Sequence, residues 1–161
     1  MPDTTFDPRV EVNGVNLFKG EFTKIALRQE PGLPHHMSNR VIDPDEELLI
    51  DLEWRVSGPE VPLRMNAVGD WRIYAYAESV GPGPEIELGP QGHVSKGAVS
   101  ADLMSWSTTL KVDAKKLSEH LPASGVYKIC VVAFANSNLP GPGDDVIGFG
   151  TVPVILSERP E

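Results

Sequence analysis

Residues 46–56 read Glu-Glu-Leu-Leu-Ile-Asp-Leu-Glu-Trp-Arg-Val, and every second side chain from Leu48 onward is apolar. Three of the four residues between these apolar positions carry a charge: Asp51, Glu53 and Arg55. Apolar side chains at a period of two are typical of a β-strand that turns one face to a core and the other to water. This stretch therefore predicts a sheet with one buried and one solvated face.

Three further stretches of similar length indicate strands. In residues 70–79 the apolar side chains alternate from Trp71, and in residues 105–113 they alternate from Trp106. Residues 126–135 are apolar at nearly every position, which is typical of a strand that is central in its sheet or covered on both faces. Sheet structure is therefore expected in both halves of the chain.

Weaker patterns surround these strands. Residues 21–29 and 85–88 are predicted to be strands with looser apolar patterns. The segment 146–156 contains Gly148, Gly150 and Pro153, which favour a bulged strand at the edge of a sheet. The longest helix that we expect is a single turn within residues 113–120.

The strand count predicts an all-β chain, an antiparallel β-sandwich of about seven to eight strands with long loops and no long helix. The length of 161 residues fits one domain of ordinary size. We divide the chain into an N-terminal arm or edge strand at residues 1–20, a sandwich domain at 21–156 and a C-terminal tail at 157–161.

One segment resembles a known family of sandwiches. Residues 121–129, Leu-Pro-Ala-Ser-Gly-Val-Tyr-Lys-Ile, are similar to the segment that leads into the penultimate strand of immunoglobulin-like and fibronectin type III-like domains. The resemblance implies that the Tyr127 hydroxyl bonds back to the preceding loop and that Trp71 packs between the two sheets. It implies no particular activity, because such sandwiches host many unrelated functions.

The charge and the cysteine content restrict the partners and the compartment. The chain has 23 acidic and 14 basic residues, a net charge of −9, which disfavours nucleic acid and anionic membrane surfaces as partners. No apolar stretch approaches the ~20 residues that cross a bilayer. Cys130 is the single cysteine, so no intramolecular disulfide can form, and we expect a reducing, cytoplasmic location.

No pattern of residues indicates catalysis or a cofactor. The sequence has no Gly-x-Ser-x-Gly motif, and its glycine-rich loops are interrupted by proline, which disfavours a phosphate cradle. The adjacent His35 and His36 lack further ligands nearby, and the acidic clusters at 43–47 and 144–145 do not match a calcium loop. We therefore predict no catalytic residue, no metal site and no cofactor.

The candidate site is the outer face of the strand at residues 70–79. If Trp71 faces the core, then tyrosines and an arginine stand outward, and the strand at 126–135 would add a lysine and a phenylalanine beside Val132. Tyrosine and arginine are favoured at protein interfaces. The alternative is that the N-terminal arm or the loop at 30–45 covers these residues. The predicted partner-binding residues are Arg72, Tyr74, Tyr76, Lys128 and Phe134.

We therefore expect a non-enzymatic protein-interaction module, either a subunit of an assembly or an adaptor. A protein partner or a second copy would dock on this sheet face or add a strand at an edge. The candidate edges are the final strand and the arm at residues 10–18. The donated strand would consist of Arg9, Val10, Val12, Val15, Leu17 and Phe18.

Two other functions remain open. A carbohydrate or other small-ligand binder would use Tyr74, Tyr76 or Trp106 as a stacking platform, assisted by loop carboxylates or calcium, and calcium would then stabilise the fold. A hydrolase, which we rank last, would use the carboxylates of residues 43–53 with His35 or His36. A raised carboxylate pKa would favour that enzyme.

Overall fold

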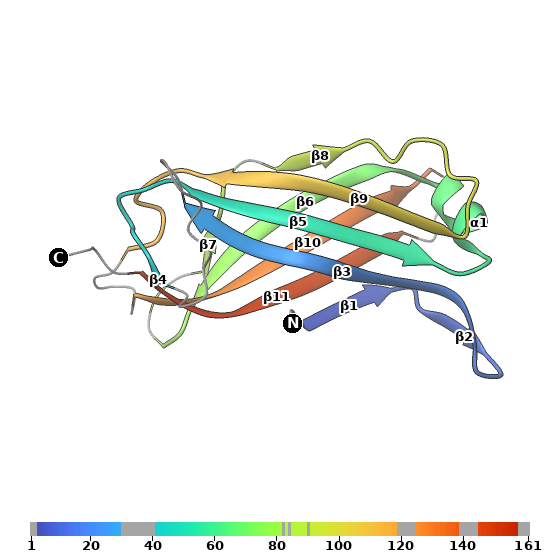
Figure 1. Ribbon diagram of the computed structural model, residues 1–161, viewed down its shortest axis with the longest axis horizontal. Helices are drawn as coiled ribbons and strands as arrows, with labels where there is room; N and C mark the ends of the chain where they lie inside the picture. The colour runs from blue at the N-terminus through green and yellow to red at the C-terminus, as the bar shows by residue number, and fades with distance from the viewer. Residues whose placement is uncertain are drawn as a thin grey trace.

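Two sheets pack face to face to form a β-sandwich (Figure 1). The structure is a computed structural model that describes residues 3–29, 41–81, 83, 85–89, 91–118, 125–138 and 145–157. All the strand pairs are antiparallel except one short parallel pair. The predicted all-β sandwich without a long helix is thus confirmed, while an immunoglobulin-like topology stays a prediction.

The larger sheet has seven strands. Its main path runs β1 (Asp3–Asp7), β11 (Val146–Ser157), β10 (Val126–Ser137), β6 (Val68–Ser79) and β7 (Glu85–Glu87). Two short strands complete it: β8 (Gly92–Val94) also pairs with β6, and β4 (Val41–Ile42) pairs with the end of β11. The apolar strand β10 is therefore central in its sheet, as its sequence predicts.

The smaller sheet has four strands in the order β2 (Val10–Val12), β3 (Val15–Gln29), β5 (Leu48–Ser57) and β9 (Leu103–Val112). The short helix α1 (Val61–Asn66) connects β5 to β6 across the end of the sandwich (Figure 1). The sequence reading missed this helix, and in the described part of residues 113–120 the expected helical turn is absent. Within the described residues, no helix has the length and apolar character needed to cross a membrane.

Three tryptophans from both sheets form the centre of the core. Trp71 of β6 lies with its ring centroid 5.8 Å from that of Trp54 and 5.3 Å from that of Trp106, both at steep interplanar angles. Edge-to-face contacts of this kind are favourable because the ring edge is positive and the ring face negative. The strict alternation in β5 is confirmed, since its five alternate side chains from Leu48 to Val56 are at most 2% exposed.

Both contacts that the family resemblance implied are present. Tyr127 is fully buried, and its hydroxyl donates a 2.6 Å hydrogen bond to the backbone oxygen of Ser118 in the preceding loop. Trp71 is fully buried between the sheets. These contacts fix the start of β10 and the position of β6, the two strands that carry the predicted site.

The final strand is not at an edge, and that prediction was wrong. β11 lies between β1 and β10, with Thr5 opposite Phe149 on one side and Val132 opposite the same residue on the other. A methyl group at Gly148 would overlap the ring of Phe6, and one at Gly150 would lie 2.6 Å from Ile25. Glycine is therefore required by packing against other strands, although β11 does contain an irregularity in its pairing with β10.

The N-terminal residues belong to both sheets. β1 extends the larger sheet, whereas β2 and β3 form a hairpin around Asn13 and Gly14, which have φ angles of 51° and 75°. Asn-Gly with two positive φ angles is the preferred two-residue hairpin turn. Residues 10–18 are thus paired within the chain, and Phe18 is buried in the core, so they do not form a single strand free for donation.

Candidate functional site

The five predicted partner-binding residues all lie on the outer side of the seven-stranded sheet. The alternation in β6 turns Trp71, Ile73 and Ala75 inward, each at most 2% exposed, so the side chains between them face outward. β10 pairs directly with β6, which places Phe134 opposite Arg72 and Lys128 opposite Glu78. Arg72 and Lys128 are exposed, and Tyr74, Tyr76 and Phe134 are half-buried.

Strand β11 adds two apolar side chains that the sequence reading did not single out. Ile147 lies opposite Phe134 and is 37% exposed, and Phe149 lies opposite Val132 and is 43% exposed. The signal was present, because glycines that face inward at 148 and 150 require their neighbours to face outward. We call the outer side of β6, β10 and β11 the apolar face, formed by Tyr74, Tyr76, Cys130, Val132, Phe134, Ile147 and Phe149.

These side chains form rows across three adjacent strands. The central row is Tyr74, Val132 and Phe149, and the next contains Tyr76, Cys130 and Thr151. Residues directly opposite on neighbouring strands have Cβ atoms about 4.5–5.5 Å apart, so each row is a continuous surface. The described part of the N-terminal arm does not cover it, because β1 lies beside β11 within the sheet. Within the other predicted cover, the loop at 30–45, residues 30–40 lie outside the described residues.

Charged groups stand at the two ends of the apolar face. At one end Arg72 lies opposite His93, whose Nε2 atom is 3.9 Å from a carboxylate oxygen of Asp70. At the other end Glu78 lies opposite Glu85, with Glu87 beside Tyr76. Partial burial and the negative charges of these last two glutamates raise the pKa of the Tyr76 hydroxyl, which stays neutral at physiological pH.

Cys130 is half-buried in the second row rather than in the core. Burial raises the pKa of its thiol, Glu78 and Glu85 raise it further, and Lys128 acts in the opposite direction. A thiol with a raised pKa is mostly protonated at neutral pH and is therefore a poor nucleophile. Because this environment does not activate the thiol as a nucleophile, we treat Cys130 as part of the contact surface.

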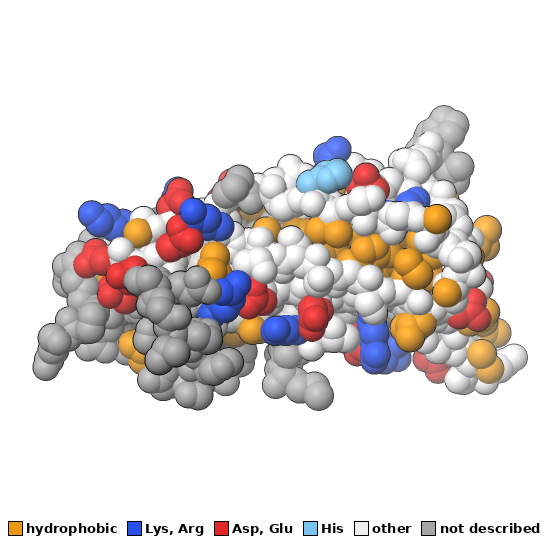
Figure 2. All heavy atoms as spheres, turned by 45° about the horizontal axis from the view of Figure 1, so that its top comes forward, with side chains coloured by type: hydrophobic (Ala, Val, Ile, Leu, Met, Phe, Trp, Pro, Cys, Tyr) orange, Lys and Arg blue, Asp and Glu red, His pale blue; other side chains and the backbone are white. Residues whose placement is uncertain are grey.

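The outer side of β3, β5 and β9, which we call the polar face, has a different character. Asp51 accepts a 2.6 Å hydrogen bond from Arg28 and a 2.7 Å bond from Thr109, and Arg55 pairs with Glu21. Figure 2, in which the top of the Figure 1 view is turned forward, shows scattered charged side chains among white atoms, which are uncharged polar side chains and backbone, below an orange hydrophobic band. A shallow depression between β5 and β9 is lined by polar groups such as Glu53, Ser107 and Thr109.

One of the carboxylates predicted for a hydrolase, Asp51, is held in its charged form on the polar face. Partial burial by itself would raise the pKa of Asp51, but hydrogen bonds from Arg28 and Thr109 and the charges of Arg28 and Lys24 outweigh burial and lower it. A lowered pKa is the opposite of what a general acid needs. The proposed partners His35 and His36 lie outside the described residues.

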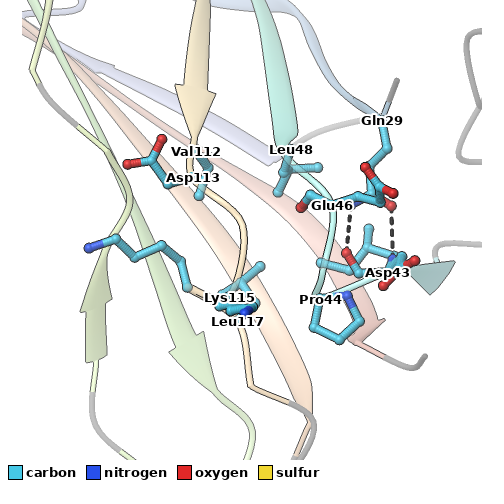
Figure 3. A pocket seen from close by; sticks show the side chains of 11 residues that line it. Gln29, Asp43, Pro44, Glu46, Leu48, Val112, Asp113, Lys115 and Leu117 are labelled. Carbon is cyan, nitrogen blue, oxygen red and sulfur yellow. Dashed lines mark hydrogen bonds between the residues drawn. The ribbon is translucent and has the colours of Figure 1, made fainter. Parts of the chain in front are cut away.

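The small space near the 43–46 loop does not form a ligand pocket (Figure 3). The Gln29 side chain donates to the backbone oxygen of Asp43 and accepts from its N–H, both at 2.8 Å, and so holds the loop against β3. The remaining volume, about 10 Å³, has room for one water molecule at most. We therefore assign Gln29 a structural role.

Trp106 lies apart from Tyr74 and Tyr76, the other two predicted sugar-stacking residues. Trp106 is 8% exposed in the core, and its indole N–H donates to the backbone oxygen of Lys96, whereas Tyr74 and Tyr76 lie on the apolar face. No group of three or more potential metal ligands occurs within the described ranges, and Asp144 lies outside them.

Comparisons of the chain with protein-family models, with curated proteins and with solved structures found no match. The apolar face is therefore interpreted from its own geometry.

Proposed function

We propose that this chain is a non-enzymatic protein-interaction module that docks a protein partner on the apolar face. The observation that carries the proposal is the central row, in which Tyr74, Val132 and Phe149 stand side by side and partly exposed on three strands. Contiguous apolar patches on monomeric proteins are often functional. Single apolar side chains scattered over a surface are common and would not indicate a functional site.

The composition of the face supports a protein partner. Tyrosine, phenylalanine and arginine are enriched at protein interfaces, and the aromatic side chains bury a large area at a small cost in side-chain entropy. The charged groups at the two ends would form the polar rim that surrounds such a centre. We place this interaction in a reducing, cytoplasmic compartment, a proposal that rests on the single cysteine.

The test is to capture proteins from a lysate of the cells that make this chain, using the native protein and two variants. The face variant carries Tyr74→Ser and Phe149→Ser, and the matched control carries Ser105→Ala and Ser107→Ala on the exposed side of β9. Circular dichroism and urea unfolding establish that all three are folded.

We expect proteins retained by the native chain and the control to be lost from the face variant by tenfold or more. That ratio corresponds to about 1.4 kcal/mol of binding free energy. Equal retention by all three chains would contradict docking on the apolar face.

A further inference from the structure

We propose that the occupant of the apolar face is a second copy of this chain, packed face to face about a two-fold axis that crosses the strands between Tyr74 and Tyr76. This inference deepens the proposed function and rests on it, since it names the partner. The argument comes from the order of the side chains along β6 and its neighbours.

A two-fold interface uses the same patch on both copies, so the patch must be complementary to itself. The proposed axis crosses β6 at the midpoint between Tyr74 and Tyr76. It places each residue of β6 over the residue of the second copy that lies at the same distance from the midpoint on its other side. Tyr74 then lies over Tyr76 of the second copy, and Arg72 lies over Glu78. Aligned packing of two sheets at about 30° would preserve this correspondence near the axis.

The charges fit this arrangement. Arg72 and Glu78 are both exposed, and neither has an ion-pair partner among the residues that the structure describes. In the dimer each would find the other, and symmetry makes the contact twice. The short strands beside β6 continue the pattern, because His93 lies opposite Arg72 and Glu85 lies opposite Glu78. His93 would therefore lie near Glu85 of the second copy.

The neighbouring strand β10 fits as well. The same axis places Val132 over Cys130 of the second copy and Phe134 over the stem and ammonium of Lys128, an arrangement that favours a cation–π contact. The net charge of −9 opposes approach at long range, but at physiological ionic strength such repulsion is screened beyond about 8 Å. The contact surfaces then decide whether two copies associate.

The size of the face sets the expected strength. The apolar face together with its flanking strands, β1 on one side and β7 and β8 on the other, is five strands wide. Five strands at about 4.8 Å spacing and seven residues at about 3.3 Å rise cover a plane of about 550 Å². This is below the roughly 800 Å² per partner of a standard interface, so we expect a dissociation constant in the micromolar range.

The first measurement is the molecular mass of the purified full chain by sedimentation velocity, from about 1 µM to about 500 µM. We expect the mass to rise from that of a monomer to twice that value. Arg72→Glu should weaken the association by tenfold or more, because it places two pairs of glutamates in contact. The matched control is Arg55→Glu on the polar face, which should leave the association unchanged.

The decisive measurement is the mixture of two charge variants. Arg72→Glu alone and Glu78→Arg alone each place like charges over one another, so both should be monomers at a concentration where the native chain dimerises. Mixed in equal amounts, they should form a heterodimer, because the two substituted side chains then face each other with opposite charges. The native Glu78 of the first variant likewise faces the native Arg72 of the second. Both substitutions lie at exposed positions, and urea unfolding checks that each variant is folded.

The outcomes separate this inference from the proposed function. A native chain that stays monomeric at the highest concentration overturns the dimer, as does a dimer that Arg72→Glu weakens no more than Arg55→Glu. A mixture that stays monomeric overturns the two-fold arrangement. In each case, loss of captured proteins from the Tyr74→Ser and Phe149→Ser variant would still support docking of a different protein on this face.

Discussion

The polar face and the apolar face are the outer sides of two sheets that share one core, yet they expose different kinds of side chain to water. On the polar face charged neighbours pair with each other, as Arg28 does with Asp51 and Arg55 does with Glu21. On the apolar face the neighbours are aromatic or aliphatic, and Phe149 is 43% exposed beside Val132. The folded sandwich needs only one buried side per sheet, so burial in the core does not explain the second apolar surface.

This difference separates residues that hold the fold from residues that are free to bind. Side chains facing inward on β6, β10 and β11 should be sensitive to substitution, and those facing outward on the same strands should tolerate it. Four measurements test that distinction, in order of decreasing expected effect.

Substitutions on the inner and outer sides of β11 should differ most in their effect on the free energy of unfolding. Gly148→Val should lower the free energy of unfolding by about 1–3 kcal/mol, because the added side chain overlaps the ring of Phe6. Phe149→Thr, one residue along, should change it by no more than about 0.5 kcal/mol. Equilibrium urea unfolding at a concentration where the chain is monomeric measures both. Equal losses would mean that Phe149 is part of the packed fold.

Two tyrosines offer a matched pair with the same substitution. Tyr127→Phe should cost about 1 kcal/mol of unfolding free energy, because it removes the hydroxyl of a fully buried side chain that donates to the backbone oxygen of Ser118. Tyr74→Phe should cost less than about 0.5 kcal/mol, since that hydroxyl faces outward. Thermal and urea unfolding of the two variants test this, and a larger loss at Tyr74 would break the distinction.

The polar face should contribute a modest, pH-dependent stability. The pKa of Asp51 is lowered from 3.8 in the folded protein, so its ion pair stabilises the fold above that pH and is lost as the pH falls through the folded pKa. Asp51→Asn should therefore cost about 0.5–1 kcal/mol at pH 7, and the difference from the native chain should vanish in acid.

Unfolding curves at several pH values measure this difference. Glu53→Gln, at the next outward position of β5, is the control and should have a smaller effect. A cost for Asp51→Asn that persists unchanged in acid would show that the charge of Asp51 is not its source.

The smallest effect concerns reactivity, with no change in stability. Burial raises the pKa of Cys130 on the apolar face, so its thiol should react with iodoacetamide severalfold more slowly than a cysteine on the polar face. The comparison variant is Ser105→Cys, at an exposed position opposite Arg55, in a Cys130→Ser chain, labelled at the same pH and followed by mass spectrometry. Faster labelling of Cys130 would mean that the apolar face is more open than its half-buried side chains indicate.

Local patterns were sufficient for much of the fold and for part of the site. The alternation in β5, β6 and β9 placed each side chain on its correct face, and the apolar run of β10 placed that strand at the centre of a sheet. Because β6 and β10 pair, the structure brings the five predicted residues to one surface. Whether that surface binds a partner remains a prediction.

The position of β11 inside the sheet could not be read from local pattern. Gly148 and Gly150 suggested an edge, but the reason for glycine lies in distant segments, since Phe6 comes from β1 and Ile25 from β3. The same distant contacts turn Ile147 and Phe149 outward and enlarge the apolar face. α1 was missed for another reason, because a helix of six residues offers too few turns to show a period.

The all-β class and the inward side of the long strands follow from the sequence alone, and the resemblance to sandwich domains implied the Tyr127 contact at the start of β10. The position of β11 between β1 and β10, and the rows that its outward side chains form with those of β6 and β10, became visible only in the folded chain. Alternation depends on each strand alone, whereas strand order and register depend on which side chains from distant segments fill the same space.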